Sequence, residues 1–166
     1  MMYLLDTPIV FELRNARTGQ AEAGLAAWAA DVARERLFLS AISLVELEAE
    51  AARMARGDKA ASAALRGWID RQVIPAFEGH ILPLDAAVAR RRGQVPLADT
   101  RDALFAATAL EHGLTLVTRK SAAFKGARLK LFDPRDYQPD NIDEDGDWRT
   151  AARNGPLWLR NLFVRG

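Results

Sequence analysis

The 166-residue chain contains no cysteine and only two histidines, His80 and His112. The absence of cysteine excludes disulfides, thiolate metal sites and thiol nucleophiles. Two histidines are too few for a histidine-rich metal centre, so any bound metal must be held mainly by oxygen atoms. Oxygen ligands favour hard ions such as Mg²⁺ or Mn²⁺.

The sequence also lacks long apolar runs and a large charge of either sign. No stretch approaches the roughly 20 apolar residues of a membrane span, and residues 1–6 are too short and too soon acidic for a signal peptide. We therefore expect a cytoplasmic protein with no membrane partner. The net charge of +1 neither requires nor excludes a nucleic acid as the partner.

Apolar residues, in contrast, make up 49% of the chain, which is sufficient for a substantial core in one domain. Short apolar segments alternate with longer amphipathic ones. The expected strands are residues 3–5, 37–39, 80–84, 114–118 and 129–132, and the expected helices are residues 20–35, 43–56, 59–73, 85–92 and 99–111. This alternation predicts βαβ crossovers, and hence an α/β fold with a central parallel sheet of about five strands flanked by helices.

Polar residues and glycine mark several helix ends. Thr7 is expected to cap a helix that begins at Pro8, since proline is tolerated in the first helical turn. Ser43 and Glu46 have the spacing of a capping box at the start of the next amphipathic helix. Gly113 is expected to end the helix that precedes the fourth strand.

The pattern changes after residue 135. Residues 138–147 are acidic and poor in apolar side chains, which predicts a linker or extended segment. We therefore divide the chain into a domain of residues 1–135 and, in residues 136–166, an acidic linker followed by an apolar extension. We expect this extension to pack on its own subunit or a dimer mate, or to dock on a separate partner, because of its apolar side chains Trp148, Leu157, Trp158, Leu162 and Phe163.

Acidic side chains lie close to the ends of the predicted strands. Asp6 follows the first strand, Glu46 lies near the start of the helix after the second, and Asp102 lies in the first turn of the helix before the fourth. Ligands bind beyond the carboxyl ends of the strands in open parallel sheets. Three converging carboxylates would repel one another unless a cation lay between them, and a divalent metal would also activate water. Each acid, taken singly, also fits a turn or helix-start role.

Four segments resemble the motifs of PIN-domain toxins. Residues 3–7, YLLDT, resemble the first motif, in which an aliphatic run precedes Asp-Thr-Asn, and residues 42–47, ISLVEL, resemble the second. Residues 101–109, RDALFAATA, closely resemble the third motif, and residues 111–119, EHGLTLVTR, continue the match into the fourth. The resemblance covers roughly residues 2–135 and is closest to the FitB/VapC branch.

The resemblance implies an Mg²⁺- or Mn²⁺-dependent endoribonuclease, the toxin of a VapBC-type toxin–antitoxin pair. Such a toxin cleaves RNA with a metal-activated water, forms a homodimer and is neutralised by its cognate antitoxin. By this resemblance Asp6, Glu46 and Asp102 are the catalytic metal ligands. The candidate substrate-binding residues are Thr7, Thr118, Arg119 and Lys120. Further candidate RNA contacts, each of which also fits a solvated face, are Arg14, Arg53, Arg56, Lys59 and residues 90–92.

Two positions depart from the family pattern. The asparagine that usually follows Asp-Thr is here Pro8, which has no polar side-chain group. The acid or asparagine that usually follows Thr-Arg is here Lys120, so a cation replaces an oxygen ligand. We expect Lys120 to pair with the carboxylates and compete with the metal. The alternative function is therefore that of a degenerate PIN domain, a non-catalytic module that binds RNA or protein.

Overall fold

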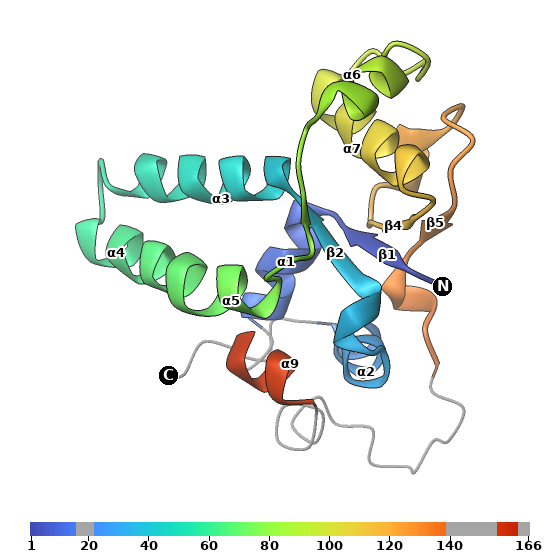
Figure 1. Cartoon of the computed structure of the whole chain (residues 1–166). Helices are drawn as coiled ribbons and strands as arrows, with labels where there is room; N and C mark the ends of the chain where they lie inside the picture. Colours follow the sequence, from blue (N-terminus) through green and yellow to red (C-terminus); the bar gives the residue numbers. More distant parts are fainter. Residues whose placement is uncertain (16–21, 139–155, 163–166) are drawn as a thin grey trace.

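The computed structural model describes residues 1–15, 22–138 and 156–162 (Figure 1). Its strands are β1 (Tyr3–Leu5), β2 (Leu37–Ser40), β3 (Ile81–Leu82), β4 (Thr115–Val117) and β5 (Leu131–Phe132). Its α-helices are α1 (Thr7–Arg14), α2 (Ala23–Asp31), α3 (Ala41–Met54), α4 (Lys59–Trp68), α5 (Ile74–Ala76), α6 (Ala86–Arg92), α7 (Thr100–Glu111) and α9 (Leu157–Leu162). Shorter turns are 3₁₀ at Arg34–Arg36, Ser121–Phe124 and Pro134–Asp136, and π-helical at Ile69–Val73. Among the helices in these ranges, none is long and apolar enough to cross a membrane.

The five strands form one parallel sheet in the order β3-β2-β1-β4-β5. This result confirms the predicted α/β fold. Strand β1 has its predicted length, β2 is one residue longer than predicted, and the other three strands are shorter. The first strand lies in the centre, with β2 on one side and β4 on the other. The chain therefore changes direction across the sheet at β1, and the carboxyl ends of β1 and β4 flank the crevice where such sheets bind ligands.

Successive residues of the central strands pack on opposite faces of the sheet. Leu4 and Leu116 contribute to a core beneath α6 and α7. Leu5 and Val117 contribute to the core on the other face, which α1, α2, α4 and α9 cover (Figure 1). This alternation follows from the two-residue repeat of a β-strand. Leu82 is only half-buried because it lies on the edge strand β3.

Helix α1 begins one residue earlier than the sequence predicted. Its N-cap is Asp6, with extended backbone, and the helix starts at Thr7, so that Pro8 is the second helical residue. The predicted capping role of Thr7 is therefore wrong. Since the side chain of Asp6 makes no capping hydrogen bond, both Asp6 and Thr7 are available to face the end of the sheet.

Helix α3 likewise begins before its predicted start. Its first residue is Ala41, and the Oγ atom of Ser40 accepts a hydrogen bond from the backbone N–H of Ile42 at 3.2 Å. The predicted capping box of Ser43 and Glu46 is therefore wrong, because strand β2 passes directly into the helix at Ser40. Both residues lie within the first two turns of α3, where their side chains can contact α1.

Helix α2 is shorter than the segment predicted at residues 20–35. It ends at Asp31, because Val32 adopts an extended conformation before the turn at Arg34–Arg36. Residues 20 and 21 lie outside the described residues. By contrast, Gly113 follows α7 as predicted, and its φ of 64° is a left-handed conformation that glycine adopts without strain.

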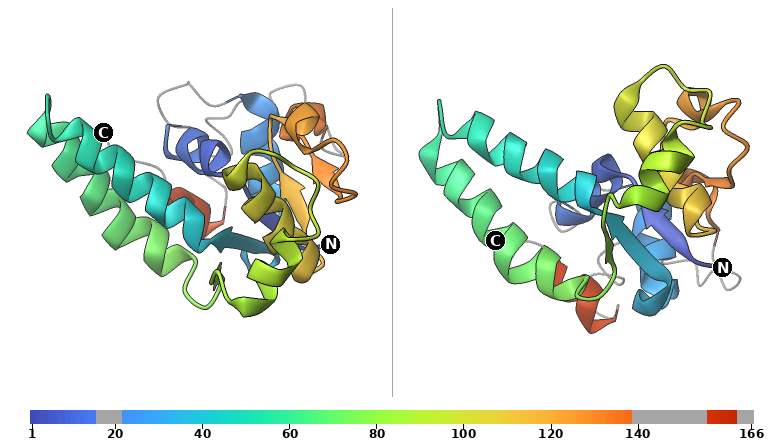
Figure 2. Two further views of the ribbon diagram at one scale, coloured as in Figure 1. Left: turned by 90° about the horizontal axis from the view of Figure 1, so that it is seen from above. Right: turned by 45° about the horizontal axis from the view of Figure 1, so that its top comes forward.

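Helices α3 and α4 lie side by side and extend away from the sheet (Figure 2). The chain reverses between them at residues 57–58, where Asp58 caps α4 by accepting a hydrogen bond from the N–H of Ala61 at 2.9 Å. The buried hydroxyl of Ser62 donates to the backbone oxygen of Ala51 at 2.6 Å and ties the two helices together. Glu46 thus projects from a helix that α4 supports through this contact.

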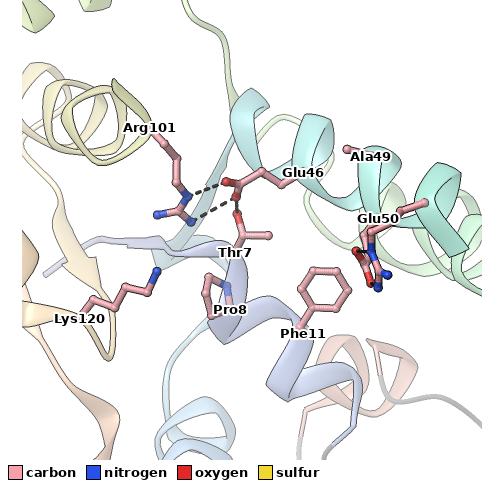
Figure 3. A pocket seen from close by; sticks show the side chains of 9 residues that line it. Thr7, Pro8, Phe11, Glu46, Ala49, Glu50, Arg101 and Lys120 are labelled. Carbon is pink, nitrogen blue, oxygen red and sulfur yellow. Dashed lines mark hydrogen bonds and ion pairs between the residues drawn. The ribbon is translucent and has the colours of Figure 1, made fainter. Parts of the chain in front are cut away.

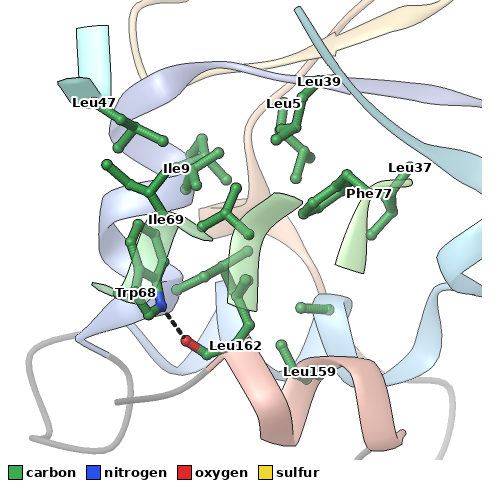
Figure 4. Close-up of a cluster of buried hydrophobic side chains, with 14 of the residues drawn as sticks. Leu5, Ile9, Leu37, Leu39, Leu47, Trp68, Ile69, Phe77, Leu159 and Leu162 are labelled. Carbon is green, nitrogen blue, oxygen red and sulfur yellow. Dashed lines mark hydrogen bonds between the residues drawn. The ribbon is translucent and has the colours of Figure 1, made fainter. Parts of the chain in front are cut away.

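The C-terminal helix α9 packs into the core of the same subunit (Figure 4). Leu159 and Leu162 are fully buried, and the indole N–H of Trp68 donates to the backbone oxygen of Leu162 at 2.6 Å. These contacts confirm the expected packing on the same subunit for residues 157–162. Residues 139–147, Trp148 and Phe163 lie outside the described residues.

Replacing Leu116 by aspartate is expected to unfold the protein. Leu116 is fully buried in a central strand, where an unpaired carboxylate has no water or cation to stabilise it. Circular dichroism and thermal melting of the variant provide the measurement. A soluble Leu116→Asp variant that melted cooperatively would contradict the assignment of β4 to the centre of the core.

The docking of α9 is tested by two leucine substitutions in the same helix. Leu159→Ala should lower the free energy of unfolding by about 2–5 kcal/mol, as is usual for a buried leucine. Leu157 is 63% exposed, and Leu157→Ala should change stability by less than about 0.5 kcal/mol. Urea unfolding of both variants gives the comparison, and equal effects would exclude the packing of α9 described above.

Candidate functional site

The candidate site lies at the carboxyl ends of β1 and β4. Leu5 is paired with Val117 in the parallel register, so the next residues, Asp6 and Thr118, lie side by side. The backbone N–H of Asp6 donates to the oxygen of Val117 at 3.0 Å. The Oγ1 atom of Thr118 donates to Oδ2 of Asp6 at 2.7 Å, and both side chains are buried. Strand pairing therefore holds this carboxylate in one orientation.

The other two predicted metal ligands come from the helices on either side. Glu46, in the second turn of α3, accepts a hydrogen bond from the hydroxyl of Thr7, whose Oγ1 also lies 3.2 Å from Oγ of Ser43. Asp102 lies in the first turn of α7, and its backbone N–H donates to Oδ1 of the N-cap Asp99 at 2.8 Å. Contacts within the fold thus position each acid.

All three acids converge on the guanidinium of Arg101. Its Nη2 lies 2.5 Å from Oδ1 of Asp6, its Nε lies 2.5 Å from Oε1 of Glu46, and its Nη1 lies 2.8 Å from Oδ1 of Asp102. Its Cζ lies 4.5 Å from the centroid of the Phe105 ring. Burial lowers the pKa of Arg101, but the hydrogen bonds and charge attraction of the carboxylates outweigh that effect and raise it above its usual value. Arg101 is therefore a firmly charged cation within the acid cluster.

Sequence reasoning brought the three acids to one edge of the sheet but missed Arg101. The sequence feature that could have indicated Arg101 is its position immediately before Asp102, in the first turn of a helix that starts at the sheet edge. The donor set, three carboxylates around one positive group, suits a hard divalent ion. In the described part of the chain, however, no three acidic or histidine side chains are grouped closely enough to hold a metal, since the guanidinium lies between these three.

A pocket of about 570 Å³ opens beside this cluster (Figure 3). Its lining residues, from α1, α3, α7 and the segment after β4, are Thr7, Pro8, Phe11, Glu46, Ala49, Glu50, Arg53, Arg101 and Lys120. Lys120 is exposed and faces this pocket, but within the described residues it forms no ion pair. The expected pairing of Lys120 with the carboxylates is made instead by Arg101, whose forked guanidinium reaches all three.

Arg119 takes part in a different ion-pair cluster. It pairs with Glu12 at 2.6 Å, with Glu22 at 2.7 Å and with Asp133 at 3.1 Å. Its hydrogen bonds to Glu12 and the attraction of the three carboxylates raise its pKa against the effect of burial. Arg119 joins α1, the start of α2 and the end of β5, and it does not line the pocket. Its predicted role in substrate binding stays a prediction.

Comparison with known proteins matches residues 3–126 to the PIN domain model. The chain is 32% identical over 141 residues to toxin FitB from Neisseria gonorrhoeae, a match that covers 80% of this chain and 98% of the relative. It is also 32% identical over 143 residues to VapC ribonuclease Y4jK from Sinorhizobium fredii, which covers 80% of this chain and 97% of the relative.

The fold is similar to a solved structure as well. The crystal structure of FitAcB from Neisseria gonorrhoeae superposes with a TM-score of 0.71 and 30% identity, over 81% of this chain and 99% of that one. The PIN match ends at residue 126, so helix α9 lies beyond it.

The contact between Thr118 and Asp6 is tested by Thr118→Val, with Thr118→Ser as the matched control. Valine removes the hydroxyl and leaves one oxygen of a buried carboxylate without this donor, which should reduce stability by about 1–3 kcal/mol. Serine retains the donor and should restore most of that loss. Urea unfolding provides the measurement, and equal stability of the valine and serine variants would show that the hydroxyl is unimportant.

Proposed function

This chain belongs to the PIN domain family, among its VapC- and FitB-like toxins, and from that premise we propose that it is a metal-dependent endoribonuclease. The supporting observation is the convergence of Asp6, Glu46 and Asp102 on a single positive group. These oxygen ligands would hold Mg²⁺ or Mn²⁺. Such an ion supplies a water of lowered pKa and offsets charge on the scissile phosphate.

The residues around the acids have distinct roles in this proposal. Thr118 orients Asp6 through its hydroxyl, and Thr7 orients Glu46. Lys120 lines the same pocket as Glu46 and is the candidate contact for a backbone phosphate of RNA. Arg119 acts indirectly, because its ion pair with Glu12 holds α1, the helix that carries Thr7.

We also propose an antitoxin partner and a homodimer. The family resemblance implies both, and the gonococcal relative was solved as FitAcB. In a toxin–antitoxin pair the antitoxin protein would neutralise the nuclease by binding this subunit. Co-expression with the gene product encoded next to this chain, followed by size-exclusion chromatography, would show whether a stable complex forms.

A second candidate function is a PIN domain that binds RNA or protein without cleaving it. The observation that favours it is the position of Arg101, which already pairs with all three carboxylates and lies where a metal would bind. Pro8 adds to it, because it lines the pocket without a polar side-chain group at the position where the family has asparagine. In this case the chain would bind RNA equally well with and without a divalent metal.

The two functions are separated by comparing the wild type with Asp102→Asn. If the chain is a nuclease, it should cut mixed RNA in the presence of Mn²⁺ and leave it intact in the presence of EDTA. Asp102→Asn should weaken Mn²⁺ binding in calorimetry by at least the roughly 10–100-fold that is typical when a ligand's supporting partner is lost. Exposed Asp70 supplies the control Asp70→Asn, which should behave like the wild type. RNA binding without Mn²⁺ binding or cleavage would favour the non-catalytic module.

A further inference from the structure

The guanidinium of Arg101 and a divalent metal compete for the same oxygen atoms. Arg101 contacts one oxygen of Asp6, one of Asp102 and both of Glu46. Asp6 is only 1% exposed, so its charge is stabilised by neighbouring groups rather than by water. Because a divalent ion bound by these three acids would have to lie between them, it cannot occupy the cluster while Arg101 remains there.

Arg101 has open space beside its present position. Its side chain is 25% exposed and lines the pocket of about 570 Å³, so its guanidinium can turn out of the acid cluster without crossing the core. The other acid of the pocket wall, Glu50, is already paired with Arg53 at 2.5 Å. The remaining cation that lines the pocket is Lys120, which has no carboxylate partner among the described residues.

A displaced Arg101 would therefore share the pocket with Lys120, and two cations there would repel each other unless an anion joined them. A phosphate of the RNA backbone meets this requirement. Guanidinium groups bind phosphate oxygens with two parallel hydrogen bonds, and lysine adds a compact positive charge. The Cζ atom of Arg101 lies 4.5 Å from the centroid of the Phe105 ring, and this cation–π contact belongs to the position of the guanidinium within the acid cluster.

We propose that Arg101 is an exchangeable counter-ion with two binding partners. Without a divalent metal it pairs with Asp6, Glu46 and Asp102 and offsets part of their negative charge. When a divalent metal occupies these acids, Arg101 turns into the pocket and, together with Lys120, binds a phosphate of the RNA substrate. This inference rests on the proposed nuclease function and adds a substrate-binding residue whose availability depends on the metal.

The exchange predicts how Arg101 affects metal binding. Arg101→Gln removes the competing charge, so Mn²⁺ should bind the full chain about tenfold more tightly than in the wild type, as expected for the loss of several partly exposed ion pairs. Arg101→Lys keeps the charge but loses the forked guanidinium, so its Mn²⁺ affinity should lie between those of the wild type and Arg101→Gln. Arg66→Gln removes a surface arginine paired with Glu48 outside the pocket and should leave the affinity unchanged.

Calorimetric titration with Mn²⁺ measures these affinities, and thermal melting gives a second readout. Without metal, Arg101→Gln should melt at a lower temperature than the wild type because the acids repel one another. Saturating Mn²⁺ should raise its melting temperature more than that of the wild type.

Should Arg101→Gln fail to fold, Arg101→Lys carries the test. Equal Mn²⁺ affinity in the wild type and both variants, with RNA cleavage intact, would overturn the exchange but leave the nuclease proposal standing. Absence of Mn²⁺ binding in all of them would overturn both.

The second part of the proposal, phosphate binding by Arg101, is tested with adenosine 5′-monophosphate. This nucleotide has a phosphate but no phosphodiester bond to cut. In saturating Mn²⁺, Arg101→Gln should bind it about tenfold more weakly than the wild type, the usual cost of losing a charged hydrogen-bonding partner. Arg66→Gln should bind it like the wild type. Isothermal titration calorimetry measures the affinities, with adenosine 5′-monophosphate titrated into Mn²⁺ buffer as the blank. Equal affinity in the wild type and Arg101→Gln would overturn the phosphate role of Arg101.

Discussion

A buried carboxylate at the end of the central strand is the constraint on which the rest of the site depends. Asp6 follows β1, the strand at which the chain crosses from one half of the sheet to the other. Its side chain has almost no access to water. A charge in such a place is stable only with well-oriented partners. Thr118 directly follows the neighbouring strand β4, and Arg101 belongs to α7. Through Arg101, the same requirement links α3 and α7 at this edge of the sheet.

The sequence predicted the elements whose formation depends on local pattern. Each central strand is a short apolar run, and α7 combines an acidic cap with the left-handed glycine Gly113. Such signals lie within a few residues of the element they define, so the sheet and most helices followed from them. The three acids were placed at one edge for the same reason, since each lies next to a predictable strand or helix end.

Features that depend on contacts between distant residues were beyond such reasoning. Ser40, not Ser43, caps α3, because the exact junction of strand and helix depends on how β2 pairs in the sheet. Lys120 was expected to meet the acids, but Arg101 of α7, 19 residues earlier in the chain, pairs with them instead. Competition between two cations for one anionic cluster is decided by three-dimensional placement, which no local pattern contains.

The contact between α9 and Trp68 has a consequence for the order of folding. Trp68 and Leu162 are 94 residues apart in the chain, yet the indole N–H of one donates to the backbone oxygen of the other. Closing so long a loop costs conformational entropy before the contact gives anything back, so non-local contacts of this kind form slowly. We therefore expect the shorter-range contacts of the sheet to form before α9 docks, and a partly folded chain would expose apolar surface around Trp68 that the native protein covers.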